Sequence, residues 1–201
     1  MAILYIETNF LMSIATGRDP KANNLLLSVP TSVRIAIPAI CCMEALSALE
    51  DEIKGRNRFA NKLTEQIIQL KRDLTSLYAK SLLFHLEESL NENAGLLNNI
   101  KVRLFEALEL LADKVEMMEL TADTLRESLN TVFIKEDPTD NLILHCILNH
   151  AHLHASEVKV FLSNNTNDFG VPQVREALRE AGITKDFSRT KDFLGWLQSQ
   201  S

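Results

Sequence analysis

Short, mainly apolar runs recur along the chain, with helical patterns between them. They are ILYI at residues 3–6, RIAIP at 34–38, VEMMEL at 115–120 and VKVFLS at 158–163. Runs of this length are typical of buried strands, because β-branched side chains pack well on a pleated sheet. Strands that alternate with helices in this way predict a parallel sheet with helices on both faces.

Helix start signals lie between the predicted strands. Asp19 precedes Pro20 and Asp137 precedes Pro138. An acid at the N-cap followed by proline favours a helix start. Proline lacks a backbone N–H, and an N–H at the first helical position would have no partner within the helix anyway. We predict helices beginning at about Asn9, over 20–27, from Pro38 to about Lys54 with Gly55 as the stop, from Thr121 to about Leu129, and over 139–153, 172–181 and 188–198.

The stretch from Arg56 to about Asp113 has a different character. It contains no proline and one glycine, Gly95, and its leucines and isoleucines recur at helical spacing. We predict two long helices broken near NENAG at 91–95, inserted between strands of the core. The expected fold class is therefore α/β, a three-layer α/β/α sandwich with a central parallel sheet of 4–5 strands. We expect one domain, residues 1–201, with a helical insertion at about 56–113.

Composition narrows the function classes. The chain is 46% hydrophobic and 24% charged, which is ordinary for a soluble globular domain. No run approaches the roughly 20 apolar residues of a membrane span, and Glu7 interrupts the apolar start, so we expect a cytoplasmic protein. The three cysteines form no CxxC pair, which predicts reduced thiols. A net charge of −6 argues against nucleic-acid binding over the whole surface and restricts it to a local basic patch.

Acidic residues accompany the apolar runs. Glu7 follows ILYI, Glu44 lies in the helix after RIAIP, Asp140 opens NLILHCIL, and Asp168 follows VKVFLS. Carboxyl ends of parallel strands meet at one edge of a sheet, where α/β proteins place their sites. Clustered carboxylates repel one another unless a cation is bound, and oxygen ligands alone favour Mg²⁺ or Mn²⁺ over zinc. The pattern predicts a metal site, although each acid alone is also explained as a helix cap or a surface charge.

Taken together, these segments resemble the PIN domain. The resemblance rests on E-T-N after the first strand, a proline followed by a helical glutamate, D-P-T-D-N-L-I-L at 137–144 and F-L-S-N-N-T-N-D-F at 161–169. It covers about residues 1–54 and 115–175, and the helical insertion makes the chain similar to the larger PIN-like proteins. The resemblance implies a metal-dependent ribonuclease, a class that includes the toxins of bacterial toxin–antitoxin pairs.

The family pattern can be carried over to this sequence residue by residue. It implies that Mg²⁺ or Mn²⁺ is held by Glu7, Glu44, Asp140 and Asp168, with Asn165 as a neutral oxygen donor, and that Thr8, Asn9, Asp137 and Ser163 support them. The chain departs from the pattern twice. Glu7 stands where the family has an aspartate, and Asn165 stands where an acid is usual. A longer side chain matters because Mg²⁺ demands near-ideal octahedral geometry.

Two functional classes follow. The first is an endoribonuclease acting on single-stranded or looped RNA, whose bases are accessible. The second is a catalytically weakened PIN-like scaffold that binds RNA or a protein partner through the helical insertion, which holds a dense set of basic residues. The implied partners are an RNA substrate, an antitoxin-like protein and a second copy of the chain. A phosphoryl-accepting receiver-like domain is a third possibility, but the chain lacks a clear lysine after its last strand, and such a domain explains Glu44 poorly.

Several histidines lie in or next to the predicted helix 139–153. His150 and His154 are four residues apart, a spacing that can bind zinc, but no glutamate of an H-E-x-x-H pattern lies between them. We therefore interpret them as packed or solvent-facing side chains. His145, nearer to Asp140, is a candidate for a supporting role around the acids.

Overall fold

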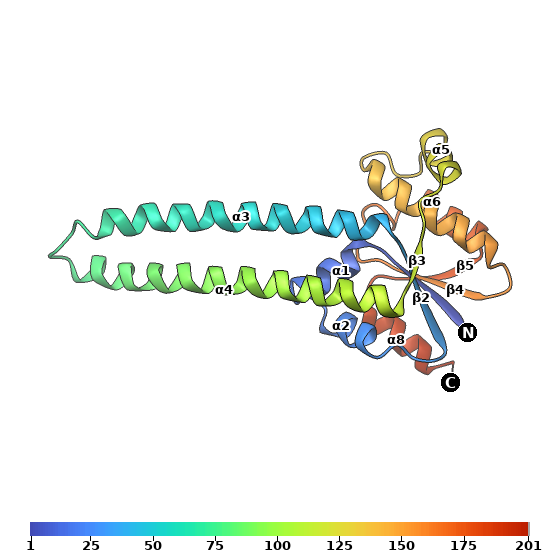
Figure 1. Cartoon of the computed structure of the whole chain (residues 1–201), viewed down its shortest axis with the longest axis horizontal. Coiled ribbons are helices and arrows are strands. Elements are labelled where there is room, and N and C mark those ends of the chain that lie inside the picture. The colour runs from blue at the N-terminus through green and yellow to red at the C-terminus, as the bar shows by residue number, and fades with distance from the viewer. Residues whose placement is uncertain (201) are drawn as a thin grey trace.

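A central sheet of five parallel strands organises the computed structural model, which describes residues 1–200 (Figure 1). The strands are β1 (Ala2–Ile6), β2 (Val33–Pro38), β3 (Glu116–Met118), β4 (Val158–Leu162) and β5 (Ile183–Phe187), in the order β3-β2-β1-β4-β5. The predicted α/β fold is confirmed. Strand β5 was not predicted, because its sequence ITKDF is mostly polar and its three middle residues are exposed at the edge of the sheet.

Helices cover both faces of this sheet. They are α1 (Thr8–Ala15), α2 (Pro20–Leu27), α3 (Ile40–Leu70), α4 (Leu77–Lys114), α5 (Ala122–Asn130), α6 (Pro138–Leu153), α7 (Pro172–Glu180) and α8 (Thr190–Gln198). Helices α1, α2, α4 and α8 pack together on one side, and α5 and α6 pack together on the other (Figure 1). The predicted three-layer sandwich is therefore confirmed. Within residues 1–200 no helix combines the length and hydrophobicity that a membrane crossing requires.

Strand β1 lies at the centre of the sheet and is buried along its whole length. Leu4 pairs with Ile35 of β2 on one side and with Val160 of β4 on the other. Side chains of β1 point to both faces, and helices cover both, so the strand is a continuous apolar run without polar alternation. This burial fixes the position of Glu7, which directly follows β1.

The long hairpin formed by α3 and α4 projects away from the α/β body (Figure 1). Two details of the prediction are wrong: α3 does not stop at Gly55, and the helices are not broken near Gly95 but between residues 70 and 77. An isolated glycine in a helix costs only about 1 kcal/mol, which good neighbouring helix formers offset. The turn is instead made by caps, since Asp73 accepts hydrogen bonds from backbone N–H groups and Ser76 caps the start of α4.

Candidate active site

The four predicted acids come from four elements that meet at the carboxyl edge of the sheet. Glu7 directly follows β1, and Glu44 lies in the second turn of α3. Asp140 lies in the first turn of α6, and Asp168 lies in the loop after β4. They are close enough to act on one another, because the charges of Glu44 and Asp168 help to raise the pKa of Asp140. The structure thus brings together the acids that the sequence singled out.

Glu7 is the most deeply buried of these acids, with 1% of its surface exposed. It is the N-cap of α1, and its Oε2 accepts a hydrogen bond of 2.6 Å from the backbone N–H of Asn9. Its Oε1 is buried and has no hydrogen bond of normal geometry, although the Ser163 hydroxyl is near enough to favour the ionised form. Burial dominates and raises the pKa of Glu7 to about 8. Without a cation, Glu7 is therefore largely protonated near neutral pH.

Glu44 is half-buried and is held by the residue that follows Glu7. The hydroxyl of Thr8 donates a hydrogen bond to Oε2 of Glu44. Burial raises the pKa of Glu44, and the charge of Asp137 adds to the effect. Thr8 therefore has the contact expected of a positioning residue, whereas Asn9 contributes its backbone amide to Glu7 rather than its side chain.

Asp140 is 6% exposed and accepts a hydrogen bond from Asn165, which stands where the family usually has an acid. The side-chain amide of Asn165 donates to Oδ2 of Asp140 at 2.8 Å, while its Oδ1 lies 3.4 Å from the backbone N–H of Asp168. Burial raises the pKa of Asp140 to about 7, with further contributions from neighbouring acids that include Asp137. Asp137 itself is the N-cap of α6 and accepts hydrogen bonds from the backbone of Thr139 and Asp140.

The carboxylates are near one another without being tightly gathered. Within residues 1–200, no three of these carboxylates each place an oxygen within 4.8 Å of the other two. Local donors account for this spread, because the Asn9 amide, the Thr8 hydroxyl and the Asn165 amide each hold one carboxylate. A cation entering the site competes with these neutral donors. The ligand roles of the acids and of Asn165 remain predictions.

The family of the chain follows from a comparison of its sequence with known families. The model of the PIN domain matches residues 4–169, which includes all the acids described above. The chain belongs to the PIN-domain family. Neither the curated proteins nor the solved structures that were compared contain a match. PIN domains are generally nucleases and typically depend on metal ions, so the acidic edge of the sheet is the candidate active site of this PIN domain.

A polar residue next to Asp140 organises the loop that leads into this site of the PIN domain. Asn141 is 3% exposed, and its Oδ1 accepts hydrogen bonds from the backbone of Phe133 and Ile134. Its Nδ2 donates to the carbonyl oxygens of Ser128 and Thr131, so the amide uses its full hydrogen-bonding capacity. The sequence does not indicate this role, because an asparagine in a helix gives no local indication of partners seven to thirteen residues upstream.

Replacing Asn141 with alanine is expected to destabilise the PIN domain. Four backbone groups lose a hydrogen bond, although the carbonyl of Thr131 keeps its bond to Nε2 of His145. Each buried group left unsatisfied costs about 1–3 kcal/mol. Chemical denaturation of Asn141→Ala measures the loss. Asn149→Ala on the same helix, which removes two hydrogen bonds of a less buried side chain, is the matched control and should cost clearly less. Equal stabilities of the two variants would contradict the role of Asn141.

A basic cavity of about 290 Å³ opens beside the acids. Its lining includes three exposed cations, Arg18, Arg189 and Lys191, against one acid, Asp19, and hydroxyl groups that include Ser163. Ser163 belongs to both the cavity and the surroundings of Glu7, so the cavity adjoins the acidic edge. The sequence did not indicate it, because its cations come from the loop after α1 and from the start of α8.

Proposed function

We propose that this PIN domain is a Mg²⁺- or Mn²⁺-dependent endoribonuclease that hydrolyses phosphodiester bonds in single-stranded or looped RNA. The observation that carries the proposal is the convergence of Glu7, Glu44, Asp140 and Asp168 at the carboxyl edge of the sheet, with the pKa values of Glu7 and Asp140 raised to about 8 and 7. Such a cluster is unfavourable as anions alone and becomes favourable beside a divalent cation. Toxin-like activity on cellular RNA is one form this function would take.

The residues present fit a hard cation. Oε1 of Glu7 is a buried carboxylate oxygen without a hydrogen bond of normal geometry, and a cation would satisfy it. Glu7, Glu44 and Asp140 would hold the metal, with Asp168 and Asn165 next to them. A bound Mg²⁺ or Mn²⁺ supplies Lewis acidity and lowers the pKa of water. The chain's own contribution is to fix the carboxylates through Thr8 and the other donors described above.

The proposed function is tested by incubating the purified protein with labelled single-stranded RNA and Mn²⁺. We expect internal cleavage that EDTA abolishes and that Mg²⁺ or Mn²⁺ restores. Metal binding is measured in parallel by calorimetry. Binding of Mn²⁺ without any cleavage of a broad set of RNAs would count against the nuclease proposal.

The basic cavity is our proposed contact for RNA phosphates near the cleavage site. Among residues 1–200, neither Arg18 nor Lys191 forms a hydrogen bond or ion pair with a carboxylate, so no carboxylate competes with phosphate for these two cations. Arg189, in contrast, pairs with Asp192. Phosphate oxygens bind exposed cations with the release of counterions. A strand whose backbone lies in this cavity would pass directly beside Ser163 and Glu7.

Replacing both Arg18 and Lys191 with glutamine is expected to weaken RNA binding and its dependence on salt. If each cation contacts one phosphate of a single strand, the slope of log affinity against log salt becomes shallower by about 1.4. Fluorescence anisotropy at several salt concentrations, without metal, measures both quantities. The matched control is Arg58→Gln with Lys62→Gln on the exposed side of α3. Loss of binding in the control alone would move the RNA contact to the hairpin.

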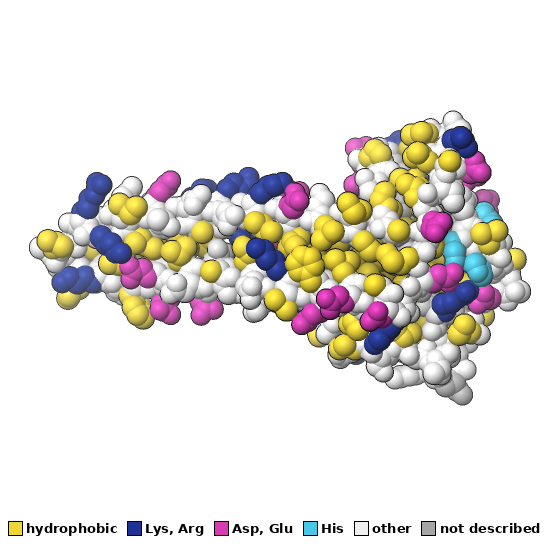
Figure 2. Space-filling view, viewed as in Figure 1, with side chains coloured by type: hydrophobic (Ala, Val, Ile, Leu, Met, Phe, Trp, Pro, Cys, Tyr) yellow, Lys and Arg dark blue, Asp and Glu magenta, His cyan; other side chains and the backbone are white. Residues whose placement is uncertain are grey.

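A catalytically weakened scaffold remains the second candidate, because the hairpin exposes large apolar side chains. Phe84 is 60% exposed and Phe105 is 52% exposed, and Figure 2 shows hydrophobic and basic side chains along the hairpin. The proposed partners of such a surface are RNA, an antitoxin-like protein or a second copy of the chain. Sedimentation of the purified protein over a concentration series tests the last of these, and a monomer at all concentrations would exclude it.

A further inference from the structure

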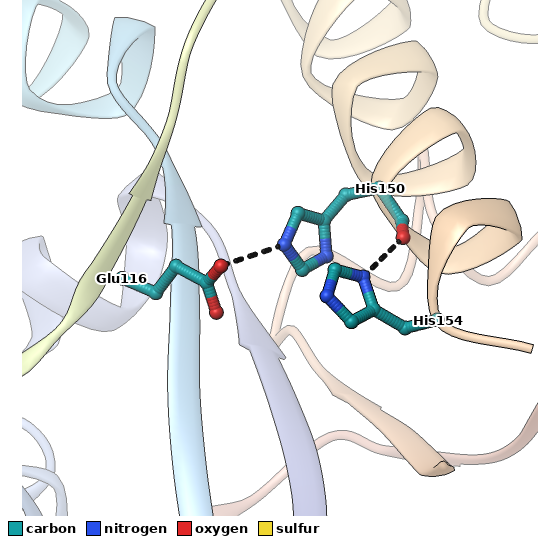
Figure 3. A group of neighbouring side chains, drawn as sticks. All are labelled: Glu116, His150 and His154. Atoms are coloured by element: carbon teal, nitrogen blue, oxygen red, sulfur yellow. Dashed lines mark hydrogen bonds and ion pairs between the residues drawn. The ribbon is translucent and has the colours of Figure 1, made fainter. Parts of the chain in front are cut away.

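A second group of metal-ligating side chains lies away from the acidic edge, under the last turn of α6. It consists of Glu116, the first residue of β3, with His150 and His154 (Figure 3). One ligand atom from each residue lies within 4.8 Å of the other two. Within residues 1–200 this is the group in which three such atoms come this close. The rings of His150 and His154 stack with centroids 4.2 Å apart, which brings the two imidazoles to the same side of the helix.

We propose that Glu116, His150 and His154 form a zinc site that is separate from the proposed nuclease site. Two imidazoles and one carboxylate are ligands that favour Zn²⁺ over Mg²⁺, which prefers oxygen ligands alone. Three protein ligands leave the fourth tetrahedral position to water. The α-helical spacing of four residues brings the two imidazoles together, and the edge strand supplies the carboxylate.

His154 is already held in the tautomer that a metal needs. Its Nδ1 lies 2.8 Å from the backbone carbonyl oxygen of His150. A carbonyl oxygen only accepts, so Nδ1 carries the proton and Nε2 keeps a free lone pair. In Figure 3 the other ring nitrogen of His154 points away from the helix, toward the side on which Glu116 lies. The helix backbone therefore orients this ligand before any metal arrives.

His150 has an equivalent outer partner. Its Nδ1 lies 2.9 Å from the hydroxyl of Tyr5, and its Nε2 lies 3.1 Å from Oε1 of Glu116. With a metal on Nε2, the Nδ1–H donates to the Tyr5 oxygen, which is the arrangement that orients histidine ligands in metal sites. Burial lowers the pKa of His150 and so favours the neutral ring. The bond between His150 and Glu116 is the one that a zinc ion would replace.

Glu116 is held in place by a cation on its far side. Its Oε2 is buried, has no hydrogen bond of normal geometry, and lies 3.2 Å from Nη1 of Arg34. Arg34 also binds Glu157 through Nη2 at 2.8 Å. The guanidinium therefore fixes Glu116 with one oxygen toward Arg34 and leaves the other oxygen facing the histidines. Figure 2 shows histidine side chains on the surface of the body, beside acidic and basic ones.

This site is independent of the proposed nuclease site. His150 follows Asp140 by ten residues of α6, which corresponds to about 15 Å along the helix. The zinc ion would join β3, a short edge strand of three residues, to the end of α6. It would thus fasten the point at which the chain leaves the hairpin, because α4 ends at Lys114, two residues before Glu116.

Calorimetric titration of the full chain with Zn²⁺, in the presence of excess Mg²⁺, tests the proposal. We expect one zinc ion per chain and a rise in the thermal midpoint. Loss of a residue that only orients a metal ligand weakens metal binding by about 10–100-fold. We expect a larger loss of zinc affinity in His154→Ala and in Glu116→Gln. His152→Ala, which alters an exposed histidine of the same helix, and Glu157→Gln, which alters the other partner of Arg34, are the matched controls and should change affinity only slightly.

Two further variants separate the outcomes. Tyr5→Phe removes only the outer partner of His150, and we expect zinc affinity to fall by about 10–100-fold. Asp140→Asn should leave zinc binding unchanged, whereas a loss there would assign the ion to the acidic edge and overturn the proposal. Absence of zinc binding by the wild type, or equal binding by His154→Ala and the wild type, would also overturn it. Circular dichroism shows whether each variant is folded. If His154→Ala does not fold, zinc binding by Glu116→Gln decides the test.

Discussion

Replacing Asp140 with asparagine is expected to abolish Mn²⁺-dependent RNA cleavage while leaving the metal-free protein at least as stable as the wild type. Loss of a residue that only orients a metal ligand lowers activity by about 10–100-fold. This substitution removes a proposed ligand itself, so we expect a larger loss of activity. It also removes a charge from a cluster that raises the pKa values of its members. Cleavage rates with saturating Mn²⁺ and thermal midpoints in EDTA measure the two effects.

Stability distinguishes this result from the loss of a helix cap. The N-cap of α6 is Asp137, and loss of a cap costs about 0.5–2 kcal/mol. Asp140→Asn leaves that cap intact, so we expect no such loss. Asp123→Asn, at an exposed position in the first turn of α5, is the control for removing an acid near a helix start and should keep full activity. Wild-type cleavage by Asp140→Asn would refute the assignment of the site.

The metal-free protein is expected to lose stability as the pH rises from about 4.5 to about 8, and Glu7→Gln should remove much of this loss. Glu7 has a pKa of about 8 in the folded state and about 4.5 ordinarily, so over this range the folded chain binds a proton that the unfolded chain has released. The free energy of unfolding therefore falls with rising pH. For a group that is 1% exposed, the effect is on the order of 4 kcal/mol.

Urea unfolding in EDTA between pH 5 and pH 9 measures this effect. Glutamine keeps an acceptor for the Asn9 amide and is neutral at every pH, so the variant should be the more stable protein at pH 8. Mn²⁺ should restore stability to the wild type at high pH, because a ligand that binds only the folded state stabilises it. Glu109→Gln, at an exposed position of α4, serves as the control. Identical pH profiles of Glu7→Gln and the wild type would show that Glu7 is ionised in the fold.

Much of the fold was predictable because its central strands are buried on both faces. Burial favours continuous apolar runs such as ILYI at 3–6 and VFL at 160–162, and these are visible without any partner. The edge strand β5 was missed because exposure lets it be polar. Gly95 predicts the hairpin turn in the wrong place, because a helix tolerates an isolated glycine, whereas Asp73 and Ser76 supply the caps that end one helix and begin the next.

The acidic edge was predictable because each acid lies at a fixed place relative to an apolar run. The cluster of Glu116, His150 and His154 was not, because its carboxylate is 34 residues away from the nearer histidine and comes from another element. The four-residue spacing of the two histidines is a weak signal by itself. It indicates a metal site only once folding places Glu116 of β3 beside them. The cations of the basic cavity were missed for the same reason, since folding alone brings them together.

The central position of β1 also determines the order in which the chain can fold during synthesis. Its partner β4 begins at Val158, which pairs with Ala2, so translation at about 5–20 residues per second separates these two residues by roughly 8–30 s. The α3–α4 hairpin consists of neighbouring segments and can form within that interval. Until Val158 emerges, one edge of an entirely apolar strand remains unpaired. The first strand is therefore exposed to pairing with other chains until β4 has been made.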